Sequence, residues 1–155
     1  MKTMVLGLGN TILSDDGVGI YVARELKGLL ENRADITIAE ASLGGLGLLD
    51  MLTGYDKVIV IDAIQTIDGK AGDIYRLDSE SLNVTRHTAS THNINFATAL
   101  ELGRKLDLDL PGKIVIYAIE AADVATFSEE CTAAVKKAIP RCAKQVIKEI
   151  SNKSR

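Results

Sequence analysis

Several residue types are scarce in this chain of 155 residues, and each scarcity excludes a class of protein. The sequence has two prolines, two cysteines, no tryptophan and 4% aromatic residues, against 46% hydrophobic residues. This composition is typical of a globular protein with an aliphatic core, and the length predicts one domain over residues 1–155. The net charge is −3, so the chain lacks the basic excess that nucleic-acid binding requires.

Long apolar runs are also missing. The N-terminal run is short, contains a single lysine, and is interrupted by Asn10 and Asp15, which is unlike a secretory signal peptide. No other run is long enough to span a bilayer. We therefore expect a cytoplasmic monomer that does not act at a membrane.

The two cysteines, Cys131 and Cys142, are predicted to lie on one helix. Their separation along such a helix would be roughly 16 Å, whereas a disulfide needs Cα atoms within about 7 Å. Both occupy positions of the apolar stripe, so we expect free, structural thiols rather than a redox or metal site.

Five apolar runs predict strands and four amphipathic segments predict helices. The strands are expected at 3–6, 36–39, 57–63, 73–77 and 114–119, and the helices at about 20–32, 46–52, 92–105 and from Ser128 onward. Strand 73–77 is expected to form an antiparallel hairpin with the strand before it. Five residues of the third helix are expected to face the core: Ile94, Ala97, Leu100, Leu102 and Leu106. Pro140 is expected to kink or divide the last helix.

This alternation predicts an α/β fold, a three-layer α/β/α sandwich with one antiparallel strand in the sheet. In such folds the functional groups gather outside the carboxyl ends of the parallel strands. Asp16 follows the first strand, Asp62 ends the third and Glu120 ends the last. A histidine, His92 or His87, comes from the polar loop before the third helix.

The loop Gly7-Leu8-Gly9-Asn10-Thr11-Ile12-Leu13-Ser14-Asp15-Asp16-Gly17-Val18-Gly19 separates the first strand from the first helix. A dinucleotide-binding loop of the form G-x-G-x-x-G would have glycine at position 12, where this chain has Ile12. Asp15 and Asp16 also disfavour an anion at the helix N-terminus. The plain alternative for one of these two aspartates is helix capping. A bound cation suits the loop better than a nucleotide.

Asp16, Asp62 and His92 would give two carboxylates and an imidazole, which suit a divalent transition metal and leave coordination positions open. Each also has a plainer interpretation. Asp62 could cap a turn, and His92 could face water. Spacing alone does not choose between His92 and His87.

The loop from Gly7 to Gly19 resembles the N-terminal motif of the hydrogenase maturation endopeptidases, which remove a C-terminal peptide from the large subunit of nickel–iron hydrogenases. The resemblance extends to the turn from Glu40 to Gly45, to Val60-Ile61-Asp62-Ala63, to Ser90-Thr91-His92 and to the last helix with Pro140. It implies a five-stranded mixed sheet whose fourth strand is antiparallel.

The resemblance also implies catalytic and metal-binding roles for Asp16, Asp62 and His92. Nickel would come with the substrate, a hydrogenase large-subunit precursor, and another divalent ion could replace it in the isolated protein. Glu40, Gly44 and Gly45 are candidates for substrate binding. The alternative from another functional class is a nickel-sensing or chaperone module that binds without hydrolysis.

Two positions depart from the family pattern. Position 16 is Asp, where some members have Glu, so the ligand is one methylene shorter. After Glu120 the chain reads Ala121-Ala122-Asp123, without the proline and serine that are common in the family. This second difference falls at the rim of the expected cleft and bears on the choice of substrate.

Overall fold

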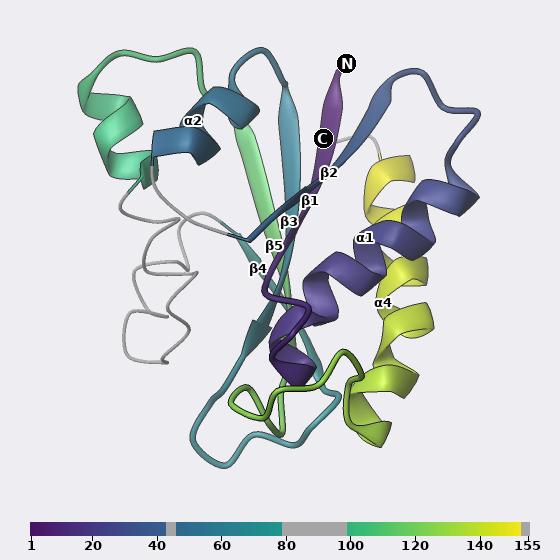
Figure 1. Cartoon of the computed structure of the whole chain (residues 1–155). Helices are drawn as coiled ribbons and strands as arrows, with labels where there is room; N and C mark the ends of the chain where they lie inside the picture. The colour runs from purple at the N-terminus through teal and green to yellow at the C-terminus, as the bar shows by residue number, and fades with distance from the viewer. Residues whose placement is uncertain (43–45, 79–98, 153–155) are drawn as a thin grey trace.

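The computed structural model describes residues 1–42, 46–78 and 99–152, which form an α/β fold (Figure 1). Residues 99–105 are helical, and a single 3-10 turn covers Ser14–Gly17. The other elements, in chain order, are β1 Thr3–Leu8, α1 Val18–Leu29, β2 Ile36–Ala41, α2 Leu46–Leu52, β3 Lys57–Ile64, β4 Ile74–Asp78, β5 Lys113–Glu120 and α4 Ala133–Ser151.

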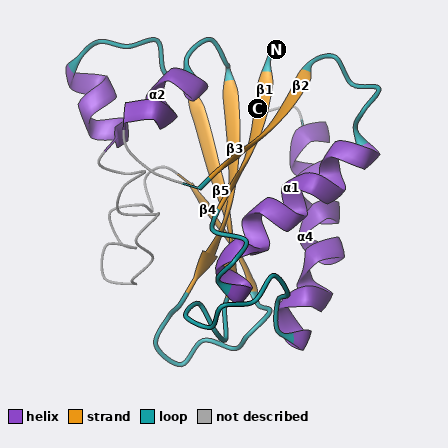
Figure 2. Ribbon diagram, viewed as in Figure 1, coloured by secondary structure: helices purple, strands orange, loops and turns teal. Residues whose placement is uncertain are grey.

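The five strands form one mixed sheet in the order β2-β1-β3-β5-β4 (Figure 2). Strands β2, β1, β3 and β5 are parallel, whereas β4 runs antiparallel to β5 at the edge. The expected five-stranded mixed sheet is therefore confirmed.

The central strands are apolar on both faces because helices cover both sides of the sheet. Every residue of β1 and of β3 is buried. In the register of the sheet, Val5 of β1 lies between Ile38 of β2 and Ile59 of β3. A continuous β-branched run is what a doubly covered parallel sheet requires.

Two apolar cores lie on the two faces of the sheet. Alternate residues of β3 belong to different cores: Ile59 and Ile61 pack with helices α1 and α4, whereas Val58 and Val60 pack with α2 and Leu100. Figure 2 shows α1 and α4 together on one face and α2 on the other. The three-layer α/β/α arrangement is confirmed.

The predicted hairpin between the third and fourth strands is wrong. β4 pairs only with β5, and β5 lies between β3 and β4. The sequence indicated the direction of β4 correctly but not its neighbour, because strands that follow one another in sequence are not always paired.

The last helix differs from the prediction at its start, and Pro140 does not divide it. It begins at Ala133, so neither Ser128 nor Cys131 belongs to it, and it continues through Pro140 without division. Both cysteines are free thiols, as expected. Within the described residues no helix is long and apolar enough to cross a membrane.

The described part of the third helix, residues 99–105, and the turn after it bury less than the pattern suggested. Leu100 is buried, as predicted, but Leu102 and Leu106 are exposed. The expectation for those two leucines is therefore wrong. Ile94 and Ala97, the other predicted core positions of this helix, lie outside the described residues.

A buried ion network joins the end of α4 to the sheet. The Lys57 ammonium donates to the Glu149 carboxylate (3.0 Å) and to the Glu149 carbonyl (2.9 Å). Arg76 and the Tyr117 hydroxyl also donate to this carboxylate. Burial alone would raise the pKa of Glu149, but hydrogen bonds from Arg76, Lys57 and Tyr117 outweigh it and lower this pKa to about 2.

Candidate functional site

The strand order identifies one crevice at the carboxyl edge of the sheet. The chain leaves β1 through α1, which lies on one face, and reaches β3 through α2, which lies on the other face (Figure 1). The crossovers therefore diverge between β1 and β3, and such a switch point is where open α/β sheets bind ligands. Asp16 follows β1 and Asp62 lies near the end of β3, so both predicted carboxylates belong to this crevice.

Asp16 is held by the loop that follows β1. The backbone N–H of Asn10 donates to the Asp16 carboxylate (3.1 Å) and to its carbonyl (3.4 Å). Gly9 makes this fold of the chain possible: its φ is +151°, and a Cβ there would lie 2.1 Å from the Asp16 carbonyl oxygen. The loop thus fixes the Asp16 backbone, and the Asp16 side chain is half-buried.

Asp62 is fully buried near the end of β3. One of its carboxylate oxygens accepts the N–H of Ala63 at 2.8 Å. The first turn of α1 packs directly on this strand, since a Cβ on Gly19 would lie 2.2 Å from the Ile61 carbonyl oxygen. Asp62 is therefore a buried carboxylate beside the turn that carries Asp16.

The carboxylates of Asp16 and Asp62 supply oxygen ligands of the kind that divalent metals bind. Each carboxylate accepts a hydrogen bond from a backbone N–H, which helps to fix its position. His92, the predicted nitrogen ligand, lies outside the described residues, as do Gly44 and Gly45. Over residues 1–42, 46–78 and 99–152 alone, three or more acidic, histidine or cysteine side chains do not converge into a metal-binding group. The described carboxylates thus fit a metal only with a further ligand.

Asp15, the neighbour of Asp16, has a structural role that the sequence did not indicate. Its carboxylate accepts hydrogen bonds from the backbone N–H groups of Ala122 (2.9 Å), Asp123 (3.1 Å) and Thr132 (2.7 Å), and from the Thr132 hydroxyl (2.8 Å). It does not cap its own helix. It joins the loop after β1 to the loop after β5.

Glu120 is occupied in the same structural way. Its buried carboxylate accepts the N–H and the hydroxyl of Thr66 and the hydroxyl of Tyr75 (3.0 Å). These contacts fix the turn between β3 and β4 against the end of β5. Glu120, one of the three carboxylates predicted at strand ends, therefore has a structural function.

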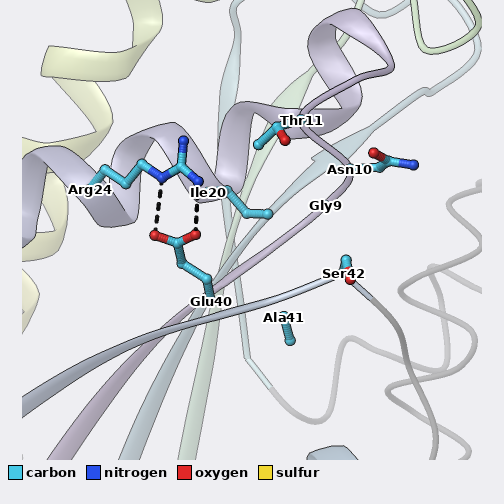
Figure 3. A pocket seen from close by; sticks show the side chains of 8 residues that line it. All are labelled: Gly9, Asn10, Thr11, Ile20, Arg24, Glu40, Ala41 and Ser42. Carbon is cyan, nitrogen blue, oxygen red and sulfur yellow. Dashed lines mark hydrogen bonds and ion pairs between the residues drawn. The ribbon is translucent and has the colours of Figure 1, made fainter. Parts of the chain in front are cut away.

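Glu40 lines a pocket of about 420 Å³ at the carboxyl ends of β1 and β2. Arg24 of α1 donates to both of its carboxylate oxygens at 3.1 Å, and Figure 3 shows the two side chains facing each other across the pocket wall. Apart from the apolar Ile20, the remaining lining residues are small or polar: Gly9, Asn10, Thr11, Ala41 and Ser42. Asn10 connects this pocket to Asp16 through the hydrogen bond described above.

Sequence reasoning missed Arg24 and Thr132. Arg24 is one of several exposed charges on an amphipathic helix, and its partner lies 16 residues away on a different element. Thr132 meets Asp15 only through a tertiary contact across 117 positions. No local pattern distinguishes either residue.

Comparison with known proteins gives a consistent result. A family model described as hydrogenase maturation protease matches residues 20–149. A Methanocaldococcus jannaschii protein provisionally assigned as a hydrogenase maturation protease is 30% identical over 147 residues, covering 88% of this chain and 90% of the relative. The hydrogenase 2 maturation protease of Escherichia coli is 25% identical over 120 residues, covering 77% and 73%.

Solved structures show the same fold. The hydrogenase maturating endopeptidase HybD from E. coli superposes with a TM-score of 0.85 at 22% identity, covering 97% of this chain and 93% of that one. The [NiFe] hydrogenase maturation protease HybD from Thermococcus kodakarensis gives 0.76 at 23% identity, covering 96% and 98%.

Proposed function

We propose that this chain, which belongs to the hydrogenase maturation protease family and is a peptidase, removes the C-terminal peptide of a nickel-loaded hydrogenase large-subunit precursor. The observation that carries the proposal is the position of Asp16 and Asp62 at the switch point between β1 and β3. The family name supports a peptidase that acts in hydrogenase maturation. We propose in addition that the substrate is a large-subunit precursor, that it carries nickel, and that the cut lies near its C-terminus.

In this proposal nickel is part of the substrate. Asp16, Asp62 and His92 are its ligands on the protease, and the precursor supplies the rest of the coordination shell. A divalent ion in such a site polarises a carbonyl or lowers the pKa of a bound water. The backbone hydrogen bonds to Asp16 and Asp62 orient the two carboxylates before the substrate arrives, which lowers the ordering cost of binding.

We also propose that the pocket beside Asn10 receives part of the precursor's peptide. Because both Glu40 oxygens are paired with Arg24, the pocket wall presents an ion pair rather than a bare carboxylate. Glu40 would therefore act together with Arg24 in substrate binding. Gly44 and Gly45 remain proposals for close approach of the substrate backbone.

A processing assay tests the main proposal. Wild-type protein is incubated with nickel-loaded precursor, and the released peptide is identified by its mass. Asp16→Asn, Asp62→Asn and His92→Ala should each abolish the release without changing the fold. Normal processing by any of these variants would remove that residue from the mechanism, and no cleavage by the wild type would contradict the proposed reaction.

The source of the metal needs a separate experiment. Two carboxylates and one imidazole make an incomplete ligand set, so the isolated protein should bind Ni²⁺ or Zn²⁺ weakly and release it to a chelator. Weak binding should fall further as the pH drops through the histidine range, because only neutral imidazole binds metal. Tight stoichiometric metal, together with equal cleavage of nickel-free precursor, would show an ordinary metalloprotease instead.

The non-hydrolytic alternative, a nickel-sensing or chaperone module, is disfavoured because the chain belongs to a protease family. A nucleotide-binding function is disfavoured by Ile12 and by the acidic residues of the loop after β1. The peptide-release assay separates both alternatives from the proposed function.

A further inference from the structure

Two large apolar side chains are exposed on two bridged loops at the carboxyl edge of the sheet. Ile12 is 48% exposed and Phe127 is 81% exposed. Leu13 and Ser128 form an isolated parallel β-bridge, in which the N–H of Ser128 donates to the Ile12 carbonyl (2.9 Å) and the N–H of Ser14 to the Ser128 carbonyl (2.8 Å). Ile12 and Phe127 immediately precede the two bridged residues, so they come from adjacent backbone segments. We refer to this pair as the apolar ridge.

The two residues of the ridge belong to two loops that are joined by several hydrogen bonds. Asp15 accepts four hydrogen bonds from the loop after β5, as described above. The Tyr21 hydroxyl contacts the carbonyls of Thr11 (3.2 Å) and Glu129, one from each loop. The Ser14 hydroxyl donates to the Glu130 carbonyl at 3.3 Å. The backbone beneath the two exposed side chains is therefore preorganised.

The ridge also adjoins the candidate catalytic residues. Ile12 belongs to the loop that carries Asp16, and the N–H of Asp16 donates to the carbonyl of Leu13, the bridged residue (3.1 Å). Phe127 belongs to the segment after Glu120 in which the sequence departs from the family pattern. A partner that covers the ridge would thus lie beside Asp16.

The two loops that carry the ridge contain acidic but no basic side chains, and the nearby cation Arg24 lies over the Tyr21 ring of α1. The loops at 9–17 and 121–132 contain five acidic residues and no basic residue: Asp15, Asp16, Asp123, Glu129 and Glu130. Glu129 and Glu130 are exposed. A complementary partner would therefore present an apolar patch with a basic border.

We propose that the apolar ridge is a docking surface for the precursor protein, and that its partner surface is an apolar patch bordered by lysine or arginine. The inference rests on the proposed function, since it assigns a contact to the same substrate. A second copy of this chain fits the surface poorly, because it would bring Glu129 and Glu130 of each copy together and would cover the edge where the substrate must enter. The ridge would hold the precursor so that its cleavage segment reaches Asp16.

The test compares Phe127→Ser and Ile12→Ser with Leu29→Ser. Leu29 is 61% exposed at the opposite end of α1 and serves as the matched control. Loss of an aromatic anchor should raise KM for the folded precursor about tenfold or more, with kcat unchanged. Ile12→Ser should raise KM less, and Leu29→Ser should leave it unchanged. The thermal midpoint of each variant verifies that the fold is intact.

A charge test is independent of the apolar contact. Glu129→Lys with Glu130→Lys should also raise KM, and the effect should shrink as the salt concentration increases. The backbone carbonyls that accept from Tyr21 and Ser14 are retained in this variant.

Failure of the inference and failure of the proposed function have different signatures. If the wild type releases the peptide and Phe127→Ser has an unchanged KM, the docking surface is wrong and the reaction stands. If the wild type releases no peptide, the reaction is wrong, and the ridge is then tested by the dissociation constant of the precursor complex. A change in oligomeric state for Phe127→Ser with unchanged KM would assign the ridge to self-association and overturn the proposal.

Discussion

The Asp15 carboxylate accepts the backbone N–H of Thr132, 117 positions later, at 2.7 Å, whereas the carboxylate of its neighbour Asp16 accepts the N–H of Asn10 at 3.1 Å within its own loop. Asp15 joins the two loops, whereas Asp16 is a proposed ligand of the substrate's nickel.

This division predicts opposite phenotypes for the two residues. Asp15→Ala removes the acceptor of three backbone N–H groups and a hydroxyl, and should lower the free energy of unfolding by about 2–4 kcal/mol. Asp16→Asn should change stability by less than about 1 kcal/mol yet abolish processing. Urea unfolding and the processing assay measure the two effects. Equal destabilisation by both substitutions would contradict the division.

Gly19 and Gly28 of α1 form a matched pair of glycines. A Cβ at Gly19 would lie 2.2 Å from the Ile61 carbonyl oxygen, whereas nothing lies within 4 Å of a Cβ at Gly28. Gly19→Ala should therefore destabilise by about 1–3 kcal/mol or more. Gly28→Ala should stabilise by about 0.5–1 kcal/mol, because alanine is the better helix former. Thermal unfolding midpoints compare the variants, and a stable Gly19→Ala protein would refute the close packing.

The hydrogen bonds to Glu149 predict that the free energy of unfolding falls in acid. Hydrogen bonds from Arg76, Lys57 and Tyr117 hold the pKa of Glu149 in the folded protein at about 2, below its ordinary value. Ionised Glu149 therefore stabilises the fold at pH values above the ordinary pKa of a glutamate side chain. That contribution should be lost as the pH falls from about 5 to about 2, and should amount to about 3 kcal/mol. Glu149→Gln should show a flatter dependence of unfolding free energy on pH in this window. Identical slopes would exclude Glu149 as the source.

The cysteines should be unreactive in the folded protein. Burial raises the pKa of Cys142 to about 12, and burial together with Asp15 raises that of Cys131 to about 11. Because the thiolate is the reactive form, alkylation near neutral pH should be slow until the protein is unfolded, when both thiols should react. Mass spectrometry after alkylation counts them, and rapid labelling of folded Cys131 would contradict its raised pKa.

The strands were predictable because a strand that is buried on both faces has an almost continuous run of apolar residues. Lys57–Ile64 is a nearly continuous apolar run, and only a doubly covered strand tolerates one. The neighbour of β4 was not predictable, because pairing with β5 depends on the whole sheet rather than on the turn before β4. The start of α4 was misplaced for a similar reason. Ser128 has the local character of a helix cap, yet it forms the bridge with Leu13.

The candidate site shows the same limit. The placement of Asp16 and Asp62 near strand ends at one edge of the sheet could be predicted, since parallel topology brings those ends together. Glu120 satisfied the same rule, but its carboxylate is occupied by Thr66 and Tyr75. The pairing of Glu40 with Arg24 and the anchoring of Asp15 are tertiary contacts, which no local spacing encodes. The choice of His92 over His87 rests on the family resemblance.

The position of β5 between β3 and β4 has a consequence for synthesis of the chain on the ribosome. β4 is made before β5, yet among the described strands its partner is β5 alone. Until Lys113–Glu120 emerges, the edge of the largely apolar β3 that pairs with β5 lacks that partner, and β4 lacks its own. Open apolar edges of this kind promote aggregation. The nascent protein is therefore most vulnerable just before β5 appears, and a chain halted there would need protection that the finished sheet does not.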